Sequence, residues 1–205
     1  MCHDDEKGNW LEKPDHRQCA ECHEDEYKGF SEGKHGMRAA VSLPAMSVAE
    51  ALLPFNKQAG NARHGCNSCH AAHNFDTQFA GKQACLNCHA DEHSLAFEKS
   101  PHAKITGSTE YKGDPADNMM SCATCHLPAI KKKQNGTEVV YIEHNQNVNL
   151  RPNEKMIRPV CMQCHSLEFS IDALADEELI KNNFSSKPAT HIPSVDWAMQ
   201  RADKK

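Results

Sequence analysis

One arrangement of cysteine and histidine occurs five times in the chain. Each copy has two cysteines separated by two residues, with a histidine directly after the second cysteine. The copies lie at residues 19–23, 66–70, 85–89, 122–126 and 161–165 and consist of Cys19, Cys22 and His23; Cys66, Cys69 and His70; Cys85, Cys88 and His89; Cys122, Cys125 and His126; and Cys161, Cys164 and His165. Two thiols at this spacing reach both vinyl groups of one porphyrin, and the next residue then lies at the iron. The pattern therefore predicts five covalently attached haem c groups, with the motif histidines as proximal ligands.

Other uses of paired cysteines explain less of the pattern. A zinc ribbon joins two cysteine pairs into one tetrahedral site and needs no histidine directly after each pair. A disulfide framework leaves the five histidines unexplained. An iron–sulfur cluster needs four cysteine ligands in tighter runs, which the sequence lacks. Haem attachment is therefore the preferred interpretation of all five copies.

Nine histidines lie outside the motifs and can supply the second axial ligand that a low-spin electron-transfer haem needs. We predict six of them as distal ligands: His35, His73, His93, His102, His144 and His191. His16 and His64 rank behind these because each precedes an attachment cysteine by two or three residues. Among the methionines, Met37 is the nearest to a ligand, and most of the others are expected to pack.

An internal repeat links two of the predicted ligands. After the first motif an acidic pair is followed by Phe30 and, five residues later, by His35. After the third motif another acidic pair is followed by Phe97 and His102 at the same spacing. We expect His35 and His102 to play equivalent parts. His73 follows His70 by three residues, which is close enough to address a neighbouring haem.

The eleventh cysteine leaves a question open. Cys2 followed by His3 has the form of the second half of an attachment motif, and Cys2 precedes Cys19 by a spacing close to that between Cys66 and Cys85. A sixth haem with His3 as proximal ligand is one interpretation. This interpretation requires either a first cysteine upstream of the chain shown or attachment through a single thioether. Met1 resembles an initiating methionine, which argues against the upstream cysteine. A free thiol, an intermolecular disulfide and a lipid anchor are the alternatives.

The composition suits a protein whose interior is largely cofactor. Hydrophobic residues make up 39%, aromatic residues 6%, and the mean hydropathy is -0.72, so the chain is poorly equipped to build an apolar core from side chains alone. Bound haem would supply the missing apolar surface, and the apo-protein is expected to be largely unfolded. Five porphyrins in a 22.8 kDa chain must lie close together. We therefore predict a single domain, residues 1–205, that holds a continuous row of haems.

The elements that position these motifs are predicted to be mainly α-helical with much coil and minimal β-structure. A capping box at Ser47 and Glu50 opens a short helix that Pro54 ends or kinks. Residues 170–184 and 194–201 are two further helix candidates. Residues 138–143 are the one plausible strand, residues 106–118 read as a surface loop, and Lys131–Lys133 reads as a solvated loop.

Charge and hydropathy limit the partners. The formal net charge of -5 gives no sign of nucleic-acid binding, and no apolar run approaches the ~18 residues of a membrane span. No signal peptide opens the chain. Haem attachment of this kind takes place outside the cytoplasmic membrane, so we expect a mature exported protein, periplasmic or extracellular, with redox proteins as partners and self-association into a filament as a further possibility.

Two runs carry a resemblance to a known group of proteins. They are residues 69–77, which contain Cys-His-Ala-Ala-His, and residues 149–165, which end in the fifth motif. The chain from Cys19 to about Trp197 resembles the superfamily of hydroxylamine oxidoreductase and ammonia-forming nitrite reductase, including its pentahaem electron carriers. The resemblance implies bis-histidine ligation, stacked and perpendicular haem pairs, and a place in the periplasm or on the cell surface. The nitrite reductases have lysine in place of histidine at the catalytic haem motif, no motif here ends in lysine, and the hydroxylamine enzymes are much longer. The resemblance therefore does not imply that this chain has the catalytic activity of either enzyme group.

Three functions remain open on the sequence. The favoured one is electron transfer through closely packed, mostly bis-histidine haems, without enzymatic activity. The second is a small reductase of nitrogen or sulfur oxyanions, in which one haem keeps an open position near Arg151, Lys155 or Arg158. The third is a subunit of an extracellular cytochrome filament, in which a haem takes its distal histidine from the next copy.

Overall fold

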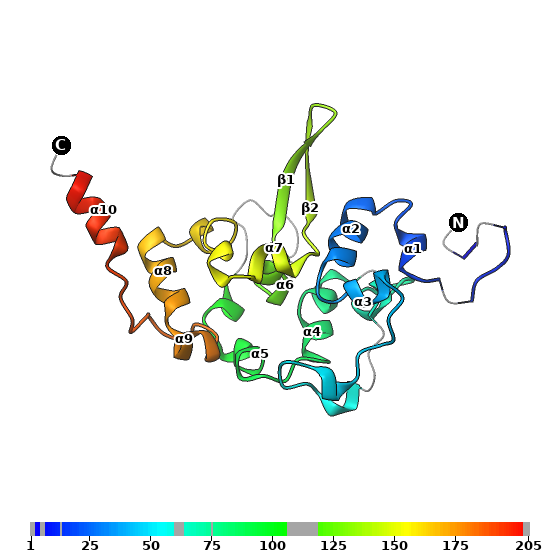
Figure 1. Cartoon of the computed structure of the whole chain (residues 1–205), viewed down its shortest axis with the longest axis horizontal. Helices are drawn as coiled ribbons and strands as arrows, with labels where there is room; N and C mark the ends of the chain where they lie inside the picture. Colours follow the sequence, from blue (N-terminus) through cyan, green and yellow to red (C-terminus); the bar gives the residue numbers. More distant parts are fainter. Residues whose placement is uncertain are drawn as a thin grey trace.

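The structure is a computed structural model that describes residues 3–4, 7–12, 14–59, 64–74, 76–105 and 119–202. Short helices connected by turns and coil dominate these residues, and the chain crosses the molecule from the α1–α3 end to the α8–α10 end (Figure 1). The α-helices are α1 (His16–Cys19), α2 (Glu24–Glu32), α3 (Met37–Ala40), α4 (Ala84–Leu86), α5 (Glu92–Ala96), α6 (Cys122–His126), α7 (Gln146–Leu150), α8 (Leu167–Ala175), α9 (Glu177–Lys181) and α10 (Ser194–Ala202). The predicted class, mainly α with much coil, is confirmed.

Single turns of tighter or wider helix complete the helical part. They are η1 (Val48–Glu50), η2 (Lys57–Ala59), η3 (Cys66–Ser68), η5 (Phe97–Lys99), η6 (His102–Lys104), η8 (Asn153–Met156) and η9 (Cys161–Gln163), together with the π-helical turn η4 (Phe79–Gln83). The capping box predicted at Ser47 is present, because the Ser47 backbone N–H donates to Glu50 Oε2 at 2.7 Å. The helix that it opens is a single turn and ends at Glu50, before Pro54.

The described residues contain one antiparallel sheet of two strands, β1 (Ala129–Gln134) and β2 (Thr137–Ile142), with Ala129 opposite Ile142 and Gln134 opposite Thr137. Asn135 and Gly136 form the turn with φ of 51° and 81°. Positive φ at both positions of a two-residue turn matches the twist of the strands, and Asn-Gly is the sequence that best tolerates it. The hairpin projects from the body of the molecule in Figure 1. The predicted strand at 138–143 corresponds to β2.

The structure corrects two of the predicted elements. The lysines at 131–133 lie in strand β1, not in a loop, and Lys132 is ion-paired with Asp25 of α2, which ties the hairpin to that helix. The segment 170–184 is not one helix. It contains the end of α8 and the whole of α9, separated by Asp176, whose backbone is extended. The Asp176 carboxylate accepts a hydrogen bond from the backbone N–H of Leu179 at 3.0 Å and so caps α9. The loop predicted at 106–118 lies outside the described residues.

Few apolar side chains are buried. Among the described residues the buried hydrophobic side chains are Ala84, Phe97, Met156, Ala173 and Leu179. Large apolar side chains such as Leu52 and Trp197 lie mostly in solvent. The side-chain core is therefore small for a chain of this length, as the composition predicts. Within the described residues no helix has both the length and the apolar character that crossing a membrane requires.

Candidate haem-binding sites

Each motif forms one helical turn that begins at its first cysteine. The backbone N–H of the motif histidine donates to the carbonyl of the first cysteine in the first, second, third and fifth motifs: His23 to Cys19 at 2.9 Å, His70 to Cys66 at 2.8 Å, His89 to Cys85 at 2.8 Å and His165 to Cys161 at 2.9 Å. The fourth motif is helix α6 itself. A helical turn puts residues three and four apart on one face. The two thiols and the imidazole of each motif therefore share a face, as attachment to one porphyrin requires.

The attachment cysteines of successive motifs lie next to one another. The Cys66 thiol is hydrogen-bonded to Cys19, and burial together with that neighbour raises the pKa of Cys66 to about 12. Burial, followed by the nearby Cys85 and Cys88 thiols, raises the pKa of Cys69 to about 11. These contacts join the first motif to the second and the second to the third.

The same kind of contact continues to the end of the row. Cys85 is hydrogen-bonded to Cys122, which raises the pKa of Cys85 further than burial alone would. Burial and then the Cys161 thiol raise the pKa of Cys125 to about 11. The motif cysteines are thus near one another in sequence order, through a hydrogen bond in two of the four steps and within electrostatic range in the other two.

Neither rival use of the cysteines has support in the described part of the chain. All ten motif cysteines are free thiols. Within the described residues, the one group of three or more possible ligands whose atoms lie within 4.8 Å of one another contains Glu168, His191 and Asp196, and no cysteine. A tetrahedral zinc site built from two cysteine pairs would bring four such atoms together.

Four motif histidines have a histidine from another segment as a ring neighbour. The pairs, with the distances between their ring centroids, are His70 with His144 at 6.3 Å, His89 with His35 at 6.1 Å, His126 with His93 at 6.0 Å, and His165 with His102 at 6.1 Å. Two imidazoles bound on opposite sides of one metal, each through a bond of about 2 Å, have ring centroids roughly 6 Å apart. All four pairs therefore fit axial ligation of an iron. Each partner is one of the predicted distal ligands.

Hydrogen bonds orient two of these distal rings. His93 Nδ1 lies 2.5 Å from the Ile180 carbonyl oxygen, and His144 Nδ1 lies 2.7 Å from the Ile142 carbonyl oxygen. A carbonyl oxygen only accepts, so Nδ1 carries the hydrogen in both rings and Nε2 keeps its lone pair. This is the tautomer of a histidine that binds a metal through Nε2, with the other nitrogen fixed by the protein. In His93 the Nε2 lone pair accepts from Asn183 Nδ2 at 3.3 Å, a bond that an iron ligand would have to give up.

Burial keeps two of the paired histidines neutral. It lowers the pKa of His35 to about 4, helped by His64 and His89, and it lowers the pKa of His126 to about 4, helped by His93 and His89. An imidazole with a pKa near 4 is uncharged at neutral pH. Both side chains are thus in the form that binds a metal ion.

Helix α2 supports the segment that carries His144. A Cβ on Gly29 would lie 3.2 Å from the His144 backbone nitrogen, and a Cβ on Gly33 would lie 2.8 Å from the His144 carbonyl oxygen. Asn145 Nδ2 also donates to Glu32 Oε2 at 3.4 Å. The absence of side chains at Gly29 and Gly33 lets the His144 segment lie directly on the helix.

The other histidines have different neighbours. His23 Nδ1 lies 4.0 Å from a Glu26 carboxylate oxygen. His64 lies beside His35 with a centroid distance of 5.2 Å, and His16 stacks on Tyr27 at 5.8 Å. His73 lies beside His3 at 5.8 Å. Met37, on α3, has 43% of its surface exposed.

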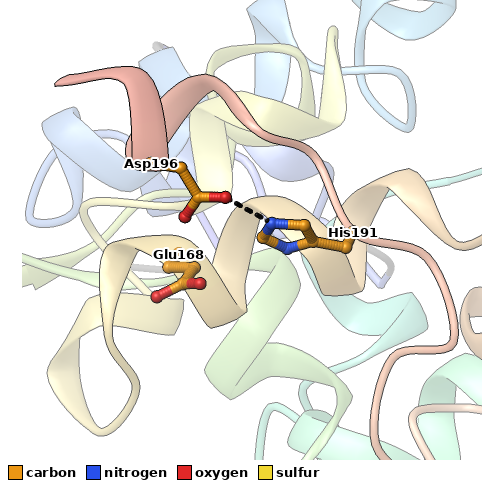
Figure 2. Close-up of side chains that lie close together, drawn as sticks. All are labelled: Glu168, His191 and Asp196. Carbon is orange, nitrogen blue, oxygen red and sulfur yellow. Dashed lines mark hydrogen bonds and ion pairs between the residues drawn. The ribbon is translucent and has the colours of Figure 1, made fainter. Parts of the chain in front are cut away.

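His191 lies among carboxylates (Figure 2). Its Nε2 is 2.9 Å from Asp196 Oδ2, and its Nδ1 is 2.9 Å from Asp172 Oδ2. These two hydrogen bonds raise the pKa of His191 to about 9. Glu168 lies across from the ring. No local sequence pattern indicates this arrangement, because Asp172 precedes His191 by 19 residues and only the fold of α8 and the chain after α9 brings them together.

Residues 18–83 match the family model described as cytochrome c554 and c-prime. This stretch holds the first two motifs together with His35 and His73. No curated protein gave a significant match. The match supports a c-type cytochrome that binds haem c and transfers electrons; it does not extend to the hydroxylamine oxidoreductase and nitrite reductase superfamily, which stays a resemblance.

Proposed function

We propose that this chain is a multihaem electron-transfer protein that holds one haem c at each of its five motifs and passes electrons along the row. The observation that carries the proposal is the repeated pairing of a motif histidine with a second histidine at 6.0–6.3 Å. One such pair would be unremarkable, since histidine rings often stack. Four pairs, each joining a motif histidine to a histidine from another segment, support a bis-histidine site at His70, His89, His126 and His165.

Haem supplies the one-electron couple, and the protein side chains determine how the couple behaves. Two nitrogen ligands keep iron six-coordinate and leave no position for a substrate. Fixed imidazoles also change little between oxidation states, and the Nδ1 hydrogen bonds of His93 and His144 provide that fixation. These features favour fast transfer over catalysis.

The contacts between attachment cysteines support a continuous path. Hydrogen bonds link Cys19 with Cys66 and Cys85 with Cys122. Cys69 lies within electrostatic range of Cys85 and Cys88, and Cys125 within that of Cys161. We propose that the haems follow the order of the motifs in the sequence. The donor and acceptor are then redox proteins that meet the two ends of the row, in the periplasm or at the cell surface.

Haem stoichiometry and ligand spectroscopy on the native protein test this function. We expect a pyridine haemochrome assay and intact mass to give at least five haems per chain. We expect electron paramagnetic resonance and near-infrared magnetic circular dichroism to show bis-histidine low-spin iron at four of them. A protein with fewer than five haems, or with mainly high-spin iron, would contradict the proposal.

A second candidate function concerns the first motif. Among the described residues, no ring contact joins His23 to another histidine, and 69% of the His23 side chain is exposed. An iron with one protein ligand at this position would accept a small oxyanion, as in a reductase, or a histidine from a second copy, as in a filament. Of the cations predicted to assist a reductase, Lys155 donates instead to the Asn147 carbonyl oxygen at 3.3 Å.

Ligand binding separates the two functions. Carbon monoxide, nitrite and azide would each perturb the spectrum of one haem if the His23 site is open in the isolated protein. An unchanged spectrum in a preparation that electron microscopy shows to be filamentous would favour closure by a second copy. An unchanged spectrum in a monomeric preparation would leave the closed electron carrier as the function.

A further inference from the structure

Backbone contacts between residues 3–4 and 10–11 fix the position of His3. Asp4 and Trp10 are bridged as antiparallel partners, and the Leu11 backbone N–H donates to the His3 carbonyl oxygen at 2.6 Å. Gly8 lies between them with φ of 75°, a conformation that glycine adopts without strain. The backbone of His3 is therefore fixed by its own segment.

The His3 ring is oriented in the same way as the distal ligands His93 and His144. Its Nδ1 lies 2.6 Å from the Leu11 carbonyl oxygen, so Nδ1 carries the hydrogen and Nε2 keeps its lone pair. The indole of Trp10 stacks on the ring with a centroid distance of 4.4 Å and an angle of 9°. The imidazole is thus held by one hydrogen bond and one aromatic contact.

The neighbour of His3 is a second histidine at the spacing of an axial pair. The centroids of His3 and His73 are 5.8 Å apart, close to the 6.0–6.3 Å of the four pairs described above. Each of those pairs joins a histidine that directly follows a cysteine to one that does not. His3 follows Cys2, and His73 follows an alanine, so this fifth pair has the same make-up.

We propose that the chain holds a sixth haem c, with His3 and His73 as its axial ligands and Cys2 as a point of attachment. The thiol of Cys2 adds across a vinyl group: a sulfur–carbon bond forms, the thiol hydrogen passes to the other vinyl carbon, and no net electrons are gained or lost. Cys2 lies outside the described residues, so its part rests on the sequence. The proposal builds on the five-haem function and adds an electron-entry or electron-exit site beside the second motif, because His73 follows His70 by three residues.

Four forms of the full-length holoprotein test the proposal. The native protein is expected to carry six haems by intact mass and pyridine haemochrome. Cys2→Ser is expected to lower the count by one. His73→Met is expected to keep six haems but convert one from bis-histidine to histidine–methionine ligation, with a new near-infrared charge-transfer band and a higher potential for that haem. Asn74→Met, which puts the same side chain at the neighbouring exposed position, is the control and should change nothing.

The outcomes separate this site from the general function. A native mass with five haems and an alkylatable thiol at Cys2 would overturn the sixth haem and leave the five-haem chain standing. Six haems with an unchanged spectrum in His73→Met would overturn the ligand assignment. Fewer than five haems in the native protein would instead contradict the proposed function itself.

Discussion

Among the proposed distal ligands, His93 has the most completely defined surroundings. Its ring lies 6.0 Å from His126, and its Nδ1 is bonded to the Ile180 carbonyl. Asn183 Nδ2 donates to its Nε2 at 3.3 Å and to its backbone oxygen at 3.0 Å. His93→Met should convert one haem to histidine–methionine ligation and raise its potential, because a thioether favours the reduced iron. Near-infrared magnetic circular dichroism and a potentiometric titration measure both effects. Leu95→Met, on the exposed face of the same helix, is the matched control; equal spectra for the two variants would exclude His93 as a ligand.

His191 gives the opposite expectation. Both of its ring nitrogens are bonded to carboxylates, so His191→Gln should leave the haem spectra unchanged. It should also loosen helix α10, because the bond from His191 to Asp196 connects that helix to α8 through Asp172. Limited proteolysis and hydrogen exchange at residues 194–202 measure the loosening, with Asp196→Asn as the companion variant. Loss of one low-spin signal in His191→Gln would instead support the axial role predicted from the sequence.

Helix α2 lets two parts of the chain approach closely. Its Gly33 cap lies against the His144 backbone and the Gln146 side chain, so a methyl group there meets atoms at 2.8 Å. Gly33→Ala should displace the His144 segment, at a cost of about 1–3 kcal/mol for overpacking, and should weaken ligation of the haem at His70. Thermal unfolding and the low-spin signal report the two effects.

Gly65→Ala is the control for this variant. Gly65 has extended backbone, and a Cβ there meets no atom within 4 Å. Its stability and spectrum should match those of the unmodified protein. If Gly33→Ala behaves in the same way, α2 does not position His144.

The elements differ in how far the sequence could predict them. The motif turns and the Ser47 capping box depend on residues three or four apart, and both could be predicted. Strand β1 could not, because its three lysines carry no apolar alternation and the strand exists only through its pairing with β2. The break at Asp176 could not be predicted, because the sequence allows both one continuous helix and a second helix capped by Asp176. The repeat predicted that His35 and His102 act alike, and both lie 6.1 Å from a motif histidine, but no local pattern indicates which one.

The part of the chain that the structure describes has a small apolar core, so we expect the chain to need haem in order to fold. Five buried hydrophobic side chains among the described residues cannot offset the conformational entropy of a chain of 205 residues. A chain produced without haem attachment should therefore lack cooperative structure. Circular dichroism and hydrogen exchange should show little helix and fast exchange throughout, and the holoprotein is the reference. A sigmoidal thermal transition in the apo-chain would contradict this.

As proposed ligands of haem iron, the four histidine pairs would also crosslink the chain. Each pair closes a loop of chain, and the loop from His70 to His144 is the central one. It overlaps the loop from His35 to His89 and the loop from His102 to His165. It encloses the loop from His93 to His126. Each closure made through a metal removes freedom from the unfolded chain, as a disulfide does. Because the loops interlock, releasing any one of them disturbs its neighbours. Ligands arranged for electron transfer would thereby also stabilise the fold, and we expect residues 35–165 to unfold as one cooperative unit.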